Sequence, residues 1–176
     1  IRGFLEHNVD DLMLLEEGAW KSPNVDVWGI SDLDLFRESH EVLKKATTEG
    51  KPVFMAIQTA AFHKPFTIPD DHGSFEAVER STEYLKKYGF VSLDEYNSFR
   101  FCDYALNEFM KLAKSSSYYE DTIFVITGDH GLTEHSLSAP EGYQDLRLSA
   151  FHVPLIIHGP GVTPGVYEKS GTHLDV

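Results

Sequence analysis

The sequence predicts an α/β fold with a largely parallel sheet and helices on both of its faces. Short apolar runs rich in β-branched and aromatic residues alternate with segments in which apolar residues recur at helical spacing. The order strand, helix, strand, loop, strand is typical of the crossover connections of a parallel sheet. At 176 residues, the chain has the size and apolar content of one ordinary domain or of part of one.

The first strong helix pattern follows Ser31 and Asp32, either of which can cap a helix. Gly50 and Pro52 end it, because neither residue favours a helix interior. Residues 1–31 are expected to be mostly loop with a short helix at most. The apolar side of the helix is expected to contain Leu33, Phe36, His40 and Leu43.

The stretch Val53–Thr59 reads VFMAIQT and is predicted to be a buried strand. A loop rich in Pro, Asp and His follows, and Phe75–Tyr88 carries the mixed charge of a surface helix. A long helix is then predicted over Asp94–Lys114, with one apolar face made by Phe99, Cys102, Leu106, Phe109, Met110 and Ala113.

The strongest strand signal is Thr122–Thr127, TIFVIT, which stops at Gly128. Pro154–His158 gives a further strand, and residues 172–176 are expected to begin another element. Ligands of open α/β sheets bind beyond the carboxyl ends of such strands. The residues that follow Thr127 are therefore expected to face a site.

An aspartate and a histidine, Asp129 and His130, come directly after this strand. A carboxylate oxygen and a neutral imidazole nitrogen are common ligands of zinc, manganese and similar ions, so the pair is predicted to bind a metal. Gly128 and Gly131 permit the turn that two adjacent ligands need. The alternative is an aspartate that caps a helix beside a surface histidine, and the dipeptide alone does not separate the two.

A second candidate, His63, lies four residues beyond the strand predicted over Val53–Thr59. If that strand is parallel to Thr122–Thr127, the loop of His63 opens at the same edge of the sheet as Asp129. Contact with a substrate is then favoured over a solvated surface histidine. Lys64 is either a phosphate-binding charge or an exposed lysine.

The composition limits the classes of partner. A formal net charge of −13 argues against nucleic acid, whose binding needs clustered Lys and Arg. The single cysteine, Cys102, excludes an internal disulfide and is interpreted as a small buried residue. No stretch is long and apolar enough to span a bilayer. The chain begins at Ile1 without a methionine, and we expect missing sequence on both sides of it.

Four sequence blocks carry a resemblance to a known family: VWGISDLDLF (27–36), KPVFMAIQTAAFHKPF (51–66), YYEDTIFVITGDHG (118–131) and HVPLIIHGPG (152–161). Together they resemble the sulfatase-like branch of the alkaline phosphatase superfamily, and most closely its membrane-anchored phosphoglycerol transferases, which include lipoteichoic acid synthases. The resemblance implies an alkaline phosphatase-like fold in which residues 1–176 form the C-terminal portion of a single catalytic domain. It also implies that the nucleophile and the first acidic metal ligand lie upstream of residue 1.

By this resemblance, Asp129 and His130 match the family's metal-ligand pair, and His63 matches a histidine that contacts the anionic group of the substrate. The implied cofactor is a divalent cation, with Mn²⁺ favoured and Zn²⁺, Mg²⁺ or Ca²⁺ left open by one Asp and one His. Trp28 resembles an aromatic residue near the head-group pocket, although a core or interface tryptophan at a helix entrance fits equally well. Lys64 and His135 are further candidates for substrate binding, with exposed loop positions as their alternative.

Other polar residues are assigned structural roles. Asp26, Asp32 and Asp34 are interpreted as helix caps and solvated carboxylates, and Asp175 as a helix cap. His173 belongs to a block that lies near the site in relatives.

The resemblance implies a metal-dependent phosphoglycerol or related phospho-transferase that acts on a membrane lipid or glycan through a covalent Thr or Ser intermediate. A sulfatase with a formylglycine nucleophile, which cleaves sulfate esters, is the alternative, and a non-catalytic domain that keeps the fold is the second alternative. The parent protein is expected at the cell membrane, anchored through N-terminal segments, with its catalytic domain extracellular or periplasmic. This chain alone is expected to be inactive, because the nucleophile is not on it.

Overall fold

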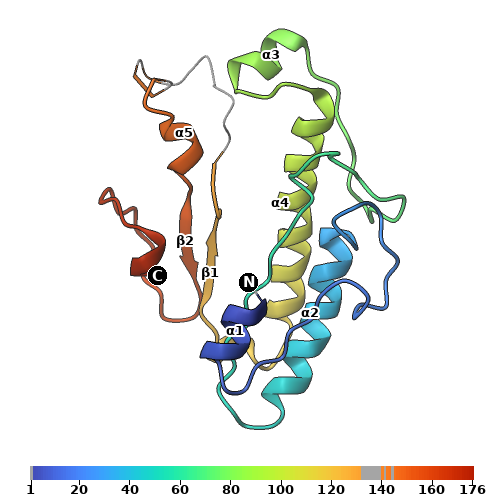
Figure 1. Cartoon of the computed structure of the whole chain (residues 1–176), viewed down its shortest axis with the longest axis vertical. Helices are drawn as coiled ribbons and strands as arrows, with labels where there is room; N and C mark the ends of the chain where they lie inside the picture. Colours follow the sequence, from blue (N-terminus) through green and yellow to red (C-terminus); the bar gives the residue numbers. More distant parts are fainter. Residues whose placement is uncertain (1, 132–139, 141, 144) are drawn as a thin grey trace.

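The computed structural model describes residues 2–131, 140, 142–143 and 145–176. His135, one of the predicted substrate-binding residues, lies outside them. Two long helices, α2 (Asp32–Thr47) and α4 (Leu93–Lys114), pack against each other. A two-stranded sheet of β1 (Phe124–Thr127) and β2 (Leu155–His158) lies next to them (Figure 1).

The remaining elements are short: α1 (Arg2–Asn8), α3 (Thr82–Lys87), α5 (Leu148–Phe151) and the 3₁₀ turns η1 (Tyr119–Asp121) and η2 (His173–Asp175). The short helix expected within residues 1–31 is confirmed by α1. The surface helix predicted over Phe75–Tyr88 is confirmed only in its second half, because Phe75 is buried in the core instead. Among the described helices, none has the length and apolar character needed to cross a membrane.

Helix α2 begins where the sequence predicts. The side-chain oxygen of Ser31 accepts a hydrogen bond from the backbone N–H of Asp34 at 3.1 Å, so Ser31 is the N-cap. Lys44 and Lys45 in the last turn complement the helix dipole, and the chain leaves the helix through Gly50 at φ 71°. The predicted inner face is confirmed by the burial of Leu33, Phe36, His40 and Leu43.

Helix α4 is also confirmed, but its inner face is turned from the predicted one. Ser92 caps it by accepting from the N–H of Glu95 at 3.1 Å. Phe99, predicted to face the core, is 48% exposed and instead contacts the ring of Phe62 edge to face and the tilted ring of Phe90. The most buried apolar positions of this helix are Phe101, Ala105, Phe109 and Ala113.

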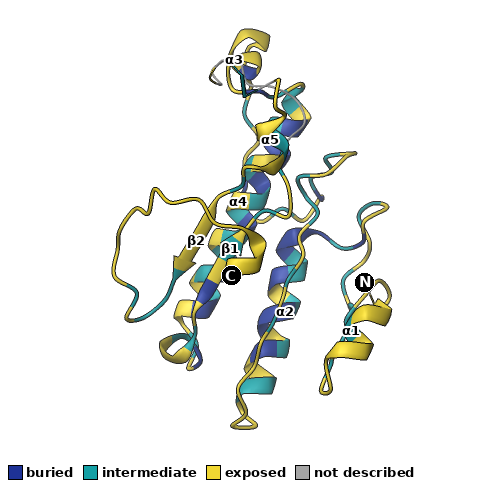
Figure 2. Cartoon of the chain, turned by 60° about the vertical axis from the view of Figure 1, so that its left-hand side comes forward, coloured by how far each residue is buried: buried dark blue, intermediate teal, exposed yellow. Residues whose placement is uncertain are grey.

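The hydrophobic core lies between α2 and α4 and extends to β1. Figure 2 shows buried residues along the facing sides of the two helices, whereas the strands are largely half-buried or exposed. Phe36 and Phe109 stack across the helix pair with ring centroids 5.0 Å apart. Phe109 in turn meets Phe124 of β1 edge to face at 6.2 Å, which joins the strand to the helices.

The sheet departs from the sequence-based expectation. β1 and β2 pair antiparallel, with Phe124 opposite His158 and Thr127 opposite Leu155. The largely parallel sheet with helices on both faces is therefore not confirmed by the described residues.

The segment Val53–Thr59, predicted to be a buried strand, forms neither a helix nor a strand of this sheet. Its partly buried side chains Met55 and Ile57 pack against the core, which explains the apolar pattern. A strand also needs a neighbouring strand for its backbone hydrogen bonds, and the described residues provide none for this segment.

Candidate functional site

The turn after β1 presents Asp129 and His130 to solvent, with side chains 73% and 70% exposed. The backbone N–H of His130 donates to Oδ1 of Asp129 at 2.9 Å, which fixes the carboxylate beside its neighbour. Nδ1 of His130 lies 3.0 Å from the carbonyl oxygen of Gly131. Since a carbonyl only accepts, Nδ1 carries the hydrogen in this contact, and Nε2 keeps its lone pair.

This geometry matches what a metal ligand pair requires. Nε2 of His130 lies 3.8 Å from Oδ2 of Asp129, a spacing that one ion can bridge with bonds of about 2.1 Å. The hydrogen bond from Nδ1 to a backbone carbonyl is the usual second partner of a metal-binding histidine, because it orients the ring. In the part of the chain that the structure describes, no cluster of three or more His, Cys, Asp or Glu could hold an ion. The pair thus fits as two ligands of an incomplete set.

Gly128 and Gly131, on either side of Asp129 and His130, serve mainly to leave space for neighbouring atoms of the segment before β2. Neither Gly128 nor Gly131 has a positive φ. A Cβ on Gly131 would lie 1.9 Å from the carbonyl oxygen of Ser149, and one on Gly128 would lie 3.0 Å from the Val153 side chain. The turn is therefore held tightly against the segment that leads into β2.

A third histidine reaches this turn from the end of the chain. Nε2 of His173 donates to the carbonyl oxygen of Gly128 at 2.7 Å. The short η2 turn that carries it is closed by a capping box. The side-chain oxygen of Thr172 accepts from a backbone N–H of the turn, and Oδ2 of Asp175 accepts from the backbone N–H of Thr172. The capping role expected of Asp175 is confirmed, and η2 brings His173 next to the residue that precedes Asp129.

A second cluster contains three of the predicted substrate-binding residues. The rings of Trp28 and His63 lie 4.1 Å apart between centroids, at an angle of 53°. The indole Nε1–H of Trp28 donates to the carbonyl oxygen of Lys64 at 2.6 Å. Trp28 is half exposed, so it is not a core tryptophan, and the alternative of an interface tryptophan stays open. Lys64 contributes its backbone to the cluster, while its side chain is exposed.

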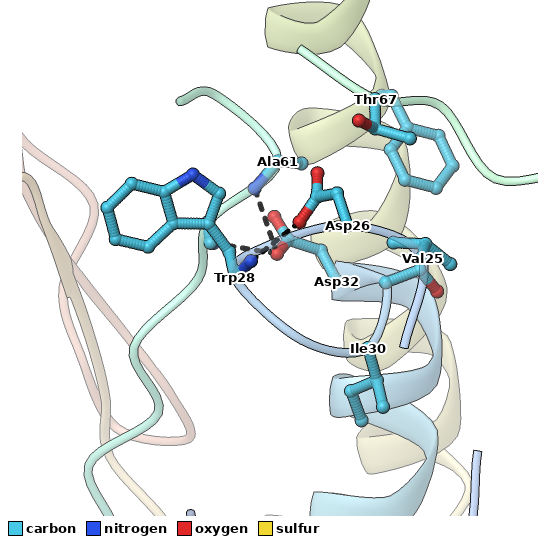
Figure 3. Close-up of a pocket in the computed structure, with 10 residues that line it drawn as sticks. Val25, Asp26, Trp28, Ile30, Asp32, Ala61 and Thr67 are labelled. Carbon is cyan, nitrogen blue, oxygen red and sulfur yellow. Dashed lines mark hydrogen bonds between the residues drawn. The ribbon is translucent and has the colours of Figure 1, made fainter. Parts of the chain in front are cut away.

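Asp32 supports the segment that leads to His63, and Figure 3 shows its carboxylate beside Trp28, hydrogen-bonded to the backbone of Ala61. Its Oδ1 accepts from the backbone N–H groups of Ala60, at 2.8 Å, and Ala61, at 3.1 Å. The Ala61 carbonyl accepts from the hydroxyl of buried Ser98 at 2.7 Å. The loop that carries His63 is thereby tied to α2 and α4.

The interpretation of Asp32 as a solvated carboxylate is wrong, since it is 2% exposed. Burial raises the pKa of Asp32, and the two amide hydrogen bonds oppose that rise. Its Oδ2 is buried without a hydrogen-bond partner in the described part of the chain. Asp34 does belong to a cap, through Ser31.

The cavity bordered by Asp32, Trp28 and Ala61 has a volume of about 10 Å³. Small-molecule sites usually enclose about 300–1,000 Å³. This cavity is therefore part of the support beneath the cluster and is far too small to enclose a phosphate or sulfate ester.

The two clusters remain separate in the structure. Among the described residues, no hydrogen bond, ion pair or ring contact joins His63 or Trp28 to Asp129 or His130. Sequence patterns also missed two supporting residues, Asp32 and Ser98. Their partners lie 28 to 37 positions away along the chain, so no local pattern marks them.

Comparison with known proteins extends along nearly the whole chain. The sequence model of the family described as Sulfatase matches residues 4–176. The chain belongs to the sulfatase family. The resemblance drawn from the four sequence blocks is thereby confirmed.

The relatives of this sulfatase-family chain include lipoteichoic acid synthases. It is 28% identical to the lipoteichoic acid synthase-like YvgJ of Bacillus subtilis over 162 residues, which cover 85% of the chain and 24% of the relative. It is 30% identical to the lipoteichoic acid synthase of Staphylococcus saprophyticus over 183 residues, which cover 86% of the chain and 27% of the relative. The chain thus spans about a quarter of the length of these relatives. Family and relatives point to an enzyme that acts on phosphate or sulfate esters.

Two solved structures have a similar fold. A crystal structure of an alkaline phosphatase superfamily protein from Vibrio parahaemolyticus superposes with a TM-score of 0.62 at 28% identity, covering 86% of this chain and 33% of that one. The lipoteichoic acid synthase LtaP of Listeria monocytogenes superposes with the same TM-score at 19% identity, covering 83% of this chain and 36% of LtaP. At this identity, the similarity supports the fold alone. The sulfatase chain therefore has an alkaline phosphatase superfamily fold.

Proposed function

We propose that this chain forms the C-terminal portion of the catalytic domain of a phosphoglycerol transferase, which acts on a membrane lipid or glycan. The observation that supports the proposal is the turn after β1, where Asp129 and His130 are adjacent and exposed, with Oδ2 of Asp129 and Nε2 of His130 3.8 Å apart. The similarity to lipoteichoic acid synthases favours phosphoglycerol transfer over sulfate ester hydrolysis.

Asp129 and His130 would hold the divalent cation, with Mn²⁺ favoured. When bound, such a cation stabilises the charge that develops on a phosphate ester and lowers the pKa of an attacking hydroxyl. Oδ2 of Asp129 and Nε2 of His130 are the free ligand atoms, because Oδ1 and Nδ1 are engaged with the backbone. The remaining ligands come, in this proposal, from residues outside the described part of the chain.

His63 and Trp28 would bind the anionic end of the substrate. The indole packs against the imidazole and is itself fixed to the Lys64 carbonyl, so the two rings are held in place before a ligand arrives. An N–H of His63 can donate to an ester oxygen and stabilise its charge. Lys64 adds a positive charge beside them. His135 stays a further candidate in this role.

The chemistry of the proposal needs a nucleophile from elsewhere in the domain. We place a Thr or Ser there, whose hydroxyl forms a covalent phosphoglycerol intermediate before transfer to the acceptor. In this proposal, the whole domain contains a largely parallel sheet with helices on both faces. It lies outside the cytoplasm and is anchored to the cell membrane through segments that precede this chain.

The test is an assay of the full-length gene product with a phosphoglycerol-bearing lipid as donor. Asp129→Ala and His130→Ala are expected to lower the transfer rate by about 100-fold or more and to remove a bound divalent ion from metal analysis. Asp10→Ala and His7→Ala, at exposed positions in other parts of the chain, serve as controls and should leave both readouts unchanged. Full activity in Asp129→Ala would contradict the proposal. Cleavage of an aryl sulfate without phosphoglycerol transfer would favour the alternative that the protein is a sulfatase. Absence of both activities would favour the alternative of a non-catalytic domain.

A further inference from the structure

The first carbonyl group beyond β1, that of Gly128, is held by a side chain from the C-terminal end of the chain. Nε2 of His173 donates to this oxygen at 2.7 Å, across 45 positions of sequence. The hydroxyl of Thr127 makes a longer contact of 3.3 Å with the same oxygen. In Figure 1 the C-terminal segment lies beside the two strands, in agreement with this contact. A distant side chain thus fixes the backbone at the point where the strand ends.

The carbonyl of Gly128 and the N–H of Asp129 belong to one planar peptide unit. A hydrogen bond that orients this carbonyl therefore also orients the backbone from which the Asp129 side chain begins. On the other side of the turn, the N–H of Gly131 donates to the carbonyl of Ala150 at 2.9 Å. The turn with the two proposed metal ligands is thus held at both ends, by His173 before it and by a backbone contact after it.

The η2 turn orders His173 through hydrogen bonds of its own. Oδ2 of Asp175 accepts from the backbone N–H and from the hydroxyl of Thr172, at 2.6 and 2.9 Å. These two bonds lower the pKa of Asp175, because they stabilise the charged carboxylate. The Thr172 oxygen accepts in turn from the N–H of Leu174 at 3.2 Å. Ordering an exposed side chain costs conformational entropy, and a turn that is already closed lowers this cost for His173.

The contact with Gly128 does not require one protonation state of His173. A carbonyl oxygen only accepts, and both the neutral and the charged imidazole can carry a hydrogen on Nε2. A glutamine side chain can place its NH₂ group near the position of Nε2, whereas the shorter asparagine places it near Nδ1. These two substitutions therefore separate the hydrogen bond from the mere presence of a polar side chain.

We propose that His173 is a positioning residue for the two metal ligands. By holding the Gly128 carbonyl, it keeps Oδ2 of Asp129 and Nε2 of His130 at the 3.8 Å spacing that one ion can bridge. Groups that orient metal ligands without touching the ion typically change the metal affinity by about 10- to 100-fold when they are removed. The inference rests on the proposed function, because it takes Asp129 and His130 as ligands of a divalent cation.

Titration of the full-length gene product with Mn²⁺, followed by the EPR signal of the free ion, measures this affinity. His173→Ala and His173→Asn are expected to raise the dissociation constant by about 10- to 100-fold. His173→Gln should stay within about threefold of the native protein, because its amide can still donate to the Gly128 carbonyl. Lys169→Ala, at an exposed position before η2, is the control and should leave the affinity unchanged. An unchanged affinity in His173→Ala, or an equal loss in His173→Gln, would overturn the inference.

Hydrogen exchange of the metal-free protein gives a second readout that needs neither ion nor activity. The amides of His130 and Gly131 are hydrogen-bonded in the turn, to Oδ1 of Asp129 and to the Ala150 carbonyl. His173→Ala should make both amides exchange about fivefold faster, because the turn opens more often, and His173→Gln should not. If the native protein bound no Mn²⁺ while this exchange pattern held, the proposed function would fail and the hold of His173 on the turn would stand. Unchanged exchange in His173→Ala would contradict that hold.

Discussion

The indole nitrogen of Trp28 donates a hydrogen bond of 2.6 Å to the carbonyl oxygen of Lys64, while the same ring system lies 4.1 Å from the imidazole of His63. One aromatic residue therefore fixes both the backbone after His63 and the ring of His63 itself. The contact crosses 36 positions of sequence. It links the block around Trp28 to the block around His63, which are separate in the sequence.

Trp28→Phe is expected to weaken substrate binding with little change in turnover. Phenylalanine keeps an aromatic face against His63 but cannot donate to Lys64, and one lost hydrogen bond of about 1 kcal/mol corresponds to about a fivefold rise in KM. Steady-state kinetics of the full-length product with a phosphoglycerol donor give KM and kcat separately. Trp20→Phe is the matched control, because Trp20 is the other tryptophan of the chain. A fall in kcat with unchanged KM would contradict a binding role for Trp28.

Asp32→Ala is expected to destabilise the chain by about 2–4 kcal/mol, because the amides of Ala60 and Ala61 lose their common acceptor in a buried place. Asp32→Asn keeps an oxygen at that position and should cost less. Urea denaturation of the 176-residue chain measures both. Asp26→Asn, nearby but less buried, is the control. Equal losses for the Ala and Asn variants would show that the acceptor oxygen is not what matters.

The raised pKa of Asp32 also gives a pH prediction. A carboxyl whose pKa is higher in the folded than in the unfolded chain stabilises the fold below its unfolded pKa, and this contribution is lost as the pH rises through its folded pKa. Asp32→Asn removes that dependence. The unfolding free energy of the Asn variant minus that of the native chain should therefore increase from about pH 3.5 upwards. If this difference stayed flat between about pH 3 and pH 7, the pKa of Asp32 would not be raised in the folded chain.

The sequence predicted those features that depend on neighbouring residues and missed those that depend on distant ones. The N-cap at Ser31 and the inner face of α2 follow from local spacing, and both are confirmed. The face of α4 was misplaced because Phe99 finds apolar partners in Phe62 and Phe90, outside the core between the long helices. The same limit applies to the candidate site. Asp129 and His130 can be recognised in the sequence because they are adjacent, whereas Asp32 hydrogen-bonds a loop that begins 28 residues later.

The strand pattern of Val53–Thr59 shows a further limit of sequence. Composition specifies that the segment prefers an extended backbone and apolar neighbours. It does not specify where the neighbouring strand comes from. The predicted strand is not formed among the described residues, since a strand is defined by pairing between two segments.

Cys102 is expected to be unreactive while the chain is folded. Burial, followed by the nearby charge of Asp32, raises the pKa of its thiol from 9.0 to about 12. At pH 8 this lowers the thiolate fraction about 1,000-fold, and the thiolate is the form that attacks disulfide reagents. Labelling with an aromatic disulfide should be slow in buffer and fast in urea. Rapid labelling of the folded chain would contradict the partly buried position of Cys102 on α4, and Cys102→Ser supplies the blank.

Gly131→Ala is expected to disturb the turn that carries Asp129 and His130, the two residues proposed to bind a metal ion. The added Cβ would meet the Ser149 carbonyl at 1.9 Å, and the hydrogen bond from the Gly131 N–H to the Ala150 carbonyl, 2.9 Å long, opposes a simple shift of the chain. Overpacking of this kind costs about 1–3 kcal/mol. Gly3→Ala is the control, since a Cβ there meets nothing within 4 Å. Denaturation of the 176-residue chain gives the stability loss, and metal analysis of the full-length product should show less bound ion for Gly131→Ala alone. If Gly131→Ala kept native stability and metal content, close packing against Ser149 would not be what positions Asp129 and His130.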